Sequence, residues 1–175
     1  LKAVFNAFNS APMLQFLEKL TGIEGLIPDP YFTGGGLHET KSGGYLGVHS
    51  DFRLNKKLNI HRRLNAIIYL NKDWQEEYGG NLELWDADMK TCLKKILPIY
   101  NRCVIFNTDK DSNHGHPEPL TTPPHITRRS IALYYYTAAT VVADPAQRNK
   151  THYKPRPKDR FSLKYYIGKL IKKKN

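Results

Sequence analysis

The chain has 175 residues and a formal net charge of +11, from 27 Lys and Arg against 16 Asp and Glu. Hydrophobic residues make up 40% of it and charged residues 25%, which fits one folded domain and argues against a mostly disordered chain. No run of about 18 apolar residues occurs, which excludes a membrane-spanning helix. Two cysteines are too few for a disulfide framework.

The first element that the sequence predicts is an amphipathic helix near the N-terminus. Ser10 is a good N-cap residue, Pro12 is tolerated in a first helical turn, and Gly22 follows the apolar-periodic stretch. A segment rich in glycine and proline follows, which predicts turns over residues 28–44. The first residues have no signal-peptide pattern, so we expect a cytoplasmic or otherwise intracellular protein.

The middle of the chain is expected to be mainly β. Short apolar or alternating runs, bounded by polar or glycine-containing segments, predict strands at 45–49, 64–70, 81–85, 102–106 and 130–136. No long helix lies between these runs, which argues against a doubly wound α/β sheet. Antiparallel pairing in a sandwich or jelly roll fits better.

The last 28 residues differ from the rest. Residues 148–175 contain 11 Lys or Arg and one acidic residue, whereas residues 1–147 are nearly neutral. A basic, proline-containing segment at 154–158 precedes a basic amphipathic helix pattern over 161–174. Two interpretations of this arm stay open: its apolar residues pack on the body of the protein, or it contacts nucleic acid or an anionic membrane.

Residues His49 and Asp51 have a spacing that suits metal binding. In a strand, residues i and i+2 point to the same side, so an imidazole and a carboxylate can bind one ion. This pair alone is a weak signal, because a surface histidine beside a loop aspartate would look the same. Two more histidines, His114 and His116, lie downstream, and Arg128 opens the last expected strand. Two histidines and one carboxylate are typical of non-haem Fe(II) oxygenases.

These motifs together resemble the Fe(II)- and 2-oxoglutarate-dependent dioxygenases, in their prolyl 4-hydroxylase-like branch. The resemblance rests on five segments, at 43–51, 64–74, 79–84, 112–117 and 127–135. It implies a double-stranded β-helix, a cupin-like jelly roll with flanking helices. We expect that domain, with its N-terminal helix, to span residues 1–147, followed by the basic arm at 148–175.

The resemblance also implies the metal ligands. It puts iron on His49, Asp51 and His114, with His116 as the rival to His114. His114 is preferred because it follows the serine-x-histidine pattern that carries the distal ligand in this family. In related halogenases a small residue replaces the carboxylate, so Asp51 favours hydroxylation.

Two further residues match positions that bind the cosubstrate in the family, and Tyr45, four positions before His49, is a third candidate. Arg128 matches the basic residue that holds the distal carboxylate of 2-oxoglutarate, a task suited to a planar, permanently charged guanidinium. Tyr69 matches a tyrosine that donates a hydrogen bond to the same carboxylate, although packing in the core explains a strand tyrosine equally well. Tyr45 lines the cosubstrate or substrate side in one interpretation and packs in the core in the other. Arg129 would point to the opposite face of its strand.

The expected reaction is hydroxylation of an unactivated C–H bond of a prolyl residue in a peptide or protein, with release of succinate and CO2. Fe(II), 2-oxoglutarate and O2 are the implied cofactors and cosubstrates, and ascorbate is a further candidate. Substrate choice is expected in the loops at 31–44, 52–63 and 109–126. The alternatives are an oxygenase acting on a small molecule and a non-catalytic jelly roll that binds polyanions through its basic arm.

Overall fold

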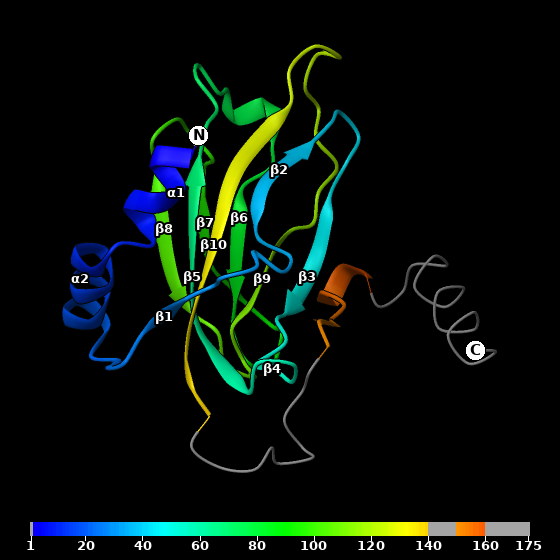
Figure 1. Ribbon diagram of the computed structural model, residues 1–175. Helices are drawn as coiled ribbons and strands as arrows, with labels where there is room; N and C mark the ends of the chain where they lie inside the picture. Colours follow the sequence, from blue (N-terminus) through cyan, green and yellow to red (C-terminus); the bar gives the residue numbers. More distant parts are fainter. Residues whose placement is uncertain (1, 140–149, 160–175) are drawn as a thin grey trace.

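Two antiparallel sheets face each other, and two helices flank one of them (Figure 1). The computed structural model describes residues 2–139 and 150–159. The helices are α1 (Lys2–Phe8) and α2 (Ala11–Thr21), and two short 3-10 turns are η1 (Glu76–Tyr78) and η2 (Pro157–Asp159).

The first sheet has six strands, and the second has five. The first consists of β1 (Ile27–Pro28), β2 (Gly36–Thr40), β4 (Leu54–Asn55), β5 (Ile60–Tyr69), β8 (Cys103–Asn107) and β10 (Arg128–Ala138). The second consists of β3 (Leu46–Ser50), β6 (Leu82–Trp85), β7 (Cys92–Ile96), β9 (Asn113–His116) and β11 (His152–Tyr153). Each sheet contributes four main strands, in the spatial orders β2-β10-β5-β8 and β3-β9-β6-β7. Along the chain these strands pass from one sheet to the other at every step except between β6 and β7, which are neighbours in the second sheet. This is the strand order of a double-stranded β-helix, and it confirms the mainly β architecture with flanking helices.

The long strands β5 and β10 separate two environments. Leu64, Ala66 and Ile68 of β5 face outward into a core shared with β10 and the helices, whereas Asn65 and Ile67 line the space between the sheets. Strand alternation produces this division, since successive side chains point to opposite faces. One face of β5 therefore builds the hydrophobic core, and the other builds the site.

Helix α2 closes the outer core, as Figure 1 shows along the left side of the first sheet. Leu17 of α2 is fully buried in the outer core. Gly22 ends the helix in a left-handed conformation and donates its backbone N–H to the Glu18 carbonyl, as its position after the periodic stretch predicts. Ser10 occupies the N-cap position, but its hydroxyl bonds to the Ala7 carbonyl of the preceding helix instead of capping α2.

The described part of the arm packs against the second sheet. Strand β11 pairs antiparallel with β3, with Tyr153 opposite His49. Arg156 is buried and bonds to both Glu118 and Asp159, which fixes this segment to the loop after β9. The division of the chain at residue 148 stays a prediction, and the amphipathic pattern at 161–174 lies outside the described residues.

Among residues 2–139 and 150–159, no helix is long and apolar enough to cross a membrane.

Candidate metal and cosubstrate site

Three potential metal ligands converge between the sheets. His49 lies on β3 and His114 lies opposite it on β9, and Asp51 follows the end of β3. Their ligand atoms all lie within 4.8 Å of one another. The Nε2 atom of His49 is 3.6 Å from Asp51 Oδ1, and the Nε2 atom of His114 is 3.5 Å from Asp51 Oδ2. The strand pairing thus unites His49 and His114, which are 65 residues apart in the sequence.

Backbone contacts orient both imidazoles for metal binding. The Nδ1 atom of His49 is 2.9 Å from the Gly47 carbonyl oxygen, and that of His114 is 3.0 Å from the Ser112 carbonyl oxygen. A carbonyl only accepts, so each Nδ1 carries the proton and each Nε2 presents its lone pair toward Asp51. Burial lowers the pKa of His114 to about 4 despite the Asp51 charge, so this ring is neutral at pH 7. The donor set therefore fits a divalent cation.

Two side chains of β5 hold the Asp51 carboxylate. Asn65 donates to Asp51 Oδ2 at 2.7 Å, and an Arg62 guanidinium nitrogen lies 3.1 Å from the same oxygen. Burial alone would raise the pKa of Asp51, but the Arg62 charge and the Asn65 hydrogen bond oppose this effect, and the pKa is held well below its usual value. Asp51 is therefore an anion with a fixed orientation, which is the state that metal ligation requires.

Aromatic rings and a hydrogen bond fix Arg62 in turn. Its guanidinium carbon lies 3.4 Å from the Tyr134 ring centroid and 4.9 Å from that of Phe52. Two of its nitrogens donate to Asn65 Oδ1, at 2.7 and 2.9 Å. Arg62 is only 3% exposed, so its guanidinium is shielded from water at the Asp51 carboxylate.

Replacing Arg62 with methionine is expected to weaken Mn(II) binding by about 10–100-fold, the usual cost of removing a residue that orients a metal ligand. The reason is that Asp51 loses the buried cation whose terminal nitrogen lies 3.1 Å from its Oδ2 atom. Arg63→Met is the matched control, because Arg63 is exposed and bonds only weakly, at 3.4 Å, to Thr137. Calorimetric titration with Mn(II) compares the two variants, and equal affinities would contradict a positioning role for Arg62.

A buried arginine lies at the other end of the same space. Arg128 starts β10 and is 6% exposed. Its Nε donates to the Gly80 carbonyl at 2.8 Å, and one terminal nitrogen lies 3.4 Å from the Tyr69 hydroxyl oxygen. Burial lowers the pKa of Arg128, and Tyr69 opposes this effect. No carboxylate of the described residues forms an ion pair with Arg128. A buried cation of this kind is suited to an anionic ligand.

Gly80 provides the room for this guanidinium. A Cβ atom at this position would lie 2.9 Å from Arg128 Cδ and 2.7 Å from Leu120 Cδ2. Gly80 also has a φ of 70°, a conformation that residues with a side chain rarely adopt. The second glycine of the pair at 79–80 thus has a steric reason in the packing around Arg128.

A cavity of about 350 Å³ joins the metal-ligand group to Arg128. Its lining includes His49, Asp51, His114 and Arg128, and Tyr45 contributes to it with a side chain that is 60% exposed. Tyr69 is fully buried and reaches the cavity only through its contact with Arg128. The adjacent Arg129 points the other way, where it pairs with Glu39 at 3.0 Å.

His116 lies in the cavity wall but outside the metal-ligand group. It is two residues beyond His114 on β9, so both side chains face the cavity. The group whose ligand atoms converge contains His49, Asp51 and His114. Burial and the nearby Arg128 charge lower the pKa of His116 to about 3. The geometry thus favours His114 over His116 as the third ligand.

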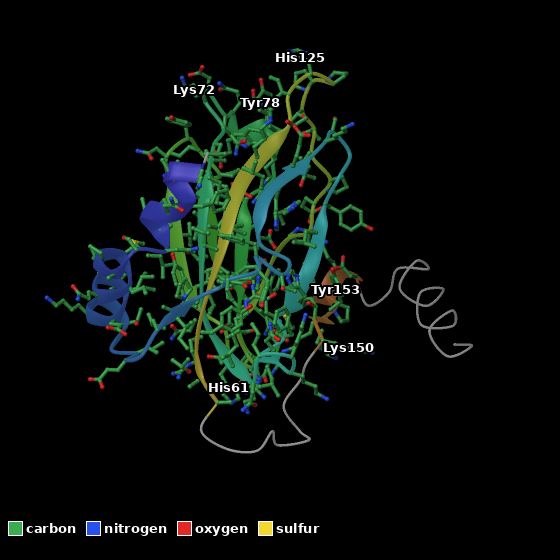
Figure 2. The ribbon with its side chains drawn as sticks, viewed as in Figure 1. His61, Lys72, Tyr78, His125, Lys150 and Tyr153 are labelled. Atoms are coloured by element: carbon green, nitrogen blue, oxygen red, sulfur yellow. The ribbon has the colours of Figure 1, made fainter. Side chains whose placement is uncertain are left out.

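The described part of the arm contributes one aromatic side chain beside the site. The Tyr153 ring centroid is 5.3 Å from that of His49. Figure 2 shows Tyr153 next to β3, far from His125 at the opposite end of the molecule. The sequence prediction assigned this segment to a basic arm and gave it no place at the site.

The fold and the site together match a known class of protein. The model of the 2OG-Fe(II) oxygenase superfamily matches residues 35–136. The chain belongs to this superfamily, as its sequence motifs predict.

The relatives within this class include prolyl hydroxylases. Mouse prolyl 3-hydroxylase OGFOD1 is 33% identical over 79 residues, which are 43% of this chain and 14% of that protein. Human prolyl hydroxylase EGLN3 is 28% identical over 78 residues, which are 44% of this chain and 30% of that protein. A prolyl 4-hydroxylase structure from Phytophthora capsici aligns with a TM-score of 0.57 and 21% identity, covering 97% of this chain and 51% of that one. This last likeness confirms the jelly-roll fold. The chain spans about half or less of the length of these relatives.

Proposed function

We propose that this chain is an Fe(II)- and 2-oxoglutarate-dependent dioxygenase that hydroxylates a prolyl residue in a peptide or protein. Its overall reaction would convert substrate C–H, 2-oxoglutarate and O2 into substrate C–OH, succinate and CO2. One observation carries the proposal: the same cavity is lined by the His-Asp-His group and by Arg128, a buried cation that forms no ion pair with a carboxylate of the described residues. The prolyl hydroxylases among the relatives support the substrate class.

The residues of the site have separate tasks in this mechanism. His49, Asp51 and His114 would hold iron on one face, and the bound iron supplies the oxidising chemistry of the family. Arg128 would bind the distal carboxylate of 2-oxoglutarate through its free N–H groups, and the Tyr69 hydroxyl, which accepts from Arg128, keeps its own proton to donate to that carboxylate.

Burial and rigidity complete the arrangement. Arg62 and Asn65 keep Asp51 ionised and oriented, so that no rearrangement is needed when the metal binds. The low exposure of the ligands and of Arg128 excludes bulk water from the cosubstrate. The mouth of the cavity, with the exposed Tyr45, is left for the substrate.

Mass spectrometry of peptide products tests the proposal. The protein is incubated with Fe(II), 2-oxoglutarate and a panel of proline-containing peptides, and succinate is measured in parallel. We expect peptide-dependent succinate and a peptide product that carries one added oxygen on proline. If no peptide is modified and a small molecule stimulates succinate formation instead, the substrate is a small molecule and not a prolyl peptide. No 2-oxoglutarate turnover with any substrate would contradict the enzymatic function.

Two further expectations stay proposals. Ascorbate would act as a reductant that keeps the iron in its Fe(II) state, and its omission should shorten the period of linear turnover. Contact of the basic arm with nucleic acid or an anionic membrane remains a prediction from charge alone.

A further inference from the structure

One polar side chain in the cavity has no task in the mechanism given above. His116 is 5% exposed, and its Nδ1 atom has no hydrogen-bond partner. Such a buried, unsatisfied group costs about 1–3 kcal/mol of stability, so it calls for an explanation in a functional cavity. An apolar residue at position 116 would avoid this cost.

The strand register shows where this imidazole lies. On the inner face of the second sheet, Leu46 of β3 is paired with His116, and His49 is paired with His114. Leu84 of β6 is opposite His114, so Leu82 is the inward-facing residue nearest to His116 on that strand. The metal-ligand histidines thus form one row of the cavity wall, and His116 is the polar centre of the next row, between two leucines.

Arg128 lies beyond this second row. Its Nε bonds to Gly80, two residues before Leu82 at the entrance to β6. A molecule that extends from the metal ligands to Arg128 must therefore pass His116.

We propose that His116 is a cosubstrate-binding residue whose ring N–H donates to the distal carboxylate of 2-oxoglutarate, beside Arg128 and Tyr69. In either protonation state the imidazole carries at least one N–H, so it can serve as a donor. This assignment rests on the proposed function, since it concerns the same cosubstrate. It gives His116 a role distinct from that of His114. It also explains why a polar residue lies between two leucines in this row of the cavity wall.

The test measures binding instead of turnover. Mn(II)-loaded protein is titrated calorimetrically with 2-oxoglutarate and with 2-oxopentanoate, which has the same chain length but lacks the distal carboxylate. The variant His116→Leu removes the donor and suits a position between leucines, and His116→Gln retains an N–H donor. We expect His116→Leu to weaken 2-oxoglutarate binding about tenfold, the effect of losing one hydrogen bond to a charged group, and His116→Gln to recover part of it.

The controls separate a binding role from a structural one. Binding of 2-oxopentanoate and of Mn(II) should stay within about twofold of wild type in His116→Leu, and its melting temperature should not fall, because the variant removes an unsatisfied polar group. Unchanged 2-oxoglutarate affinity, or an equal loss for both acids, would overturn the assignment. A wild-type protein that binds Mn(II) but not 2-oxoglutarate would instead contradict the proposed function itself.

Discussion

Replacing Asp51 with alanine is expected to reduce Mn(II) affinity by more than about 100-fold, beyond the 10–100-fold typical of changes outside the ligand set, and to abolish 2-oxoglutarate turnover. Asp51 supplies the only carboxylate in the metal-ligand group, and contacts with the Asn65 amide and the Arg62 guanidinium orient it. Alanine also leaves Arg62 buried without its counter-ion, which costs about 3–5 kcal/mol of stability. Calorimetry gives the metal affinity, and thermal melting shows whether the variant remains folded.

Two further variants show whether the loss of metal affinity is due to the Asp51 charge. Asp51→Asn retains the shape of the side chain but not its charge, so it should lose metal affinity with a smaller loss of stability. His125→Ala changes an exposed histidine far from the site (Figure 2), and it should bind Mn(II) like the wild type. A folded Asp51→Asn protein with unchanged metal affinity would refute the role of Asp51.

Replacing Arg128 with methionine is expected to weaken 2-oxoglutarate binding by about 100-fold or more, in line with the 2–5 kcal/mol lost when one partner of a buried charge pair is removed. The guanidinium is the buried cation at the end of the cavity, and its remaining N–H groups have no carboxylate partner among the described residues. Mn(II) affinity should change little, because Arg128 is not in the metal-ligand group.

Arg129 provides an internal control for this experiment. It is adjacent in sequence, but it faces outward and pairs with Glu39. Arg129→Met should therefore leave 2-oxoglutarate affinity within about twofold of wild type, as is usual for exposed ion pairs. Arg128→Lys should give an intermediate loss, since lysine keeps the charge but not the planar fork. If both methionine variants bind 2-oxoglutarate equally well, Arg128 is not the carboxylate-binding residue.

Much of the strand pattern could be predicted from the sequence. The apolar runs at 64–70 and 130–136 correspond to β5 and β10, which extend further than expected, to Ile60 and Ala138. Strands β2, β7 and β9 were harder to predict because they carry polar or glycine residues on both faces. Their pairing partners, and not their own alternation, keep them extended.

A β-bulge explains why the sequence did not predict a place for Arg62 at the site. Tyr69, Ile67 and Asn65 alternate along one face of β5, so counting back from Tyr69 could have found Asn65. The register with β10 then shifts between Tyr135 and Tyr136, and Arg63 has no partner there. The shift interrupts the alternation of inward and outward side chains along β5, so Arg62 faces inward. Bulges of this kind leave no clear signal in one sequence.

Cys103 shows that an apolar sequence run does not by itself predict which strand residues are buried. Its position in an apolar run predicts a buried strand residue, and it does lie in β8, but its side chain is exposed. Burial depends on what covers a strand, and α1 and α2 cover only part of this sheet (Figure 1). The contact of Tyr153 with His49 was also unpredictable, since it depends on the pairing of β11 with β3, two strands that lie far apart in the sequence.

A crystal structure of the protein with Mn(II) and 2-oxoglutarate, with anomalous diffraction from manganese, tests the central claim most directly. We predict one manganese peak bound by the Nε2 atoms of His49 and His114 and by the Asp51 carboxylate, with the distal carboxylate of 2-oxoglutarate on Arg128. Manganese bound by His116 in place of His114, or a cosubstrate whose distal carboxylate does not contact Arg128, would contradict it.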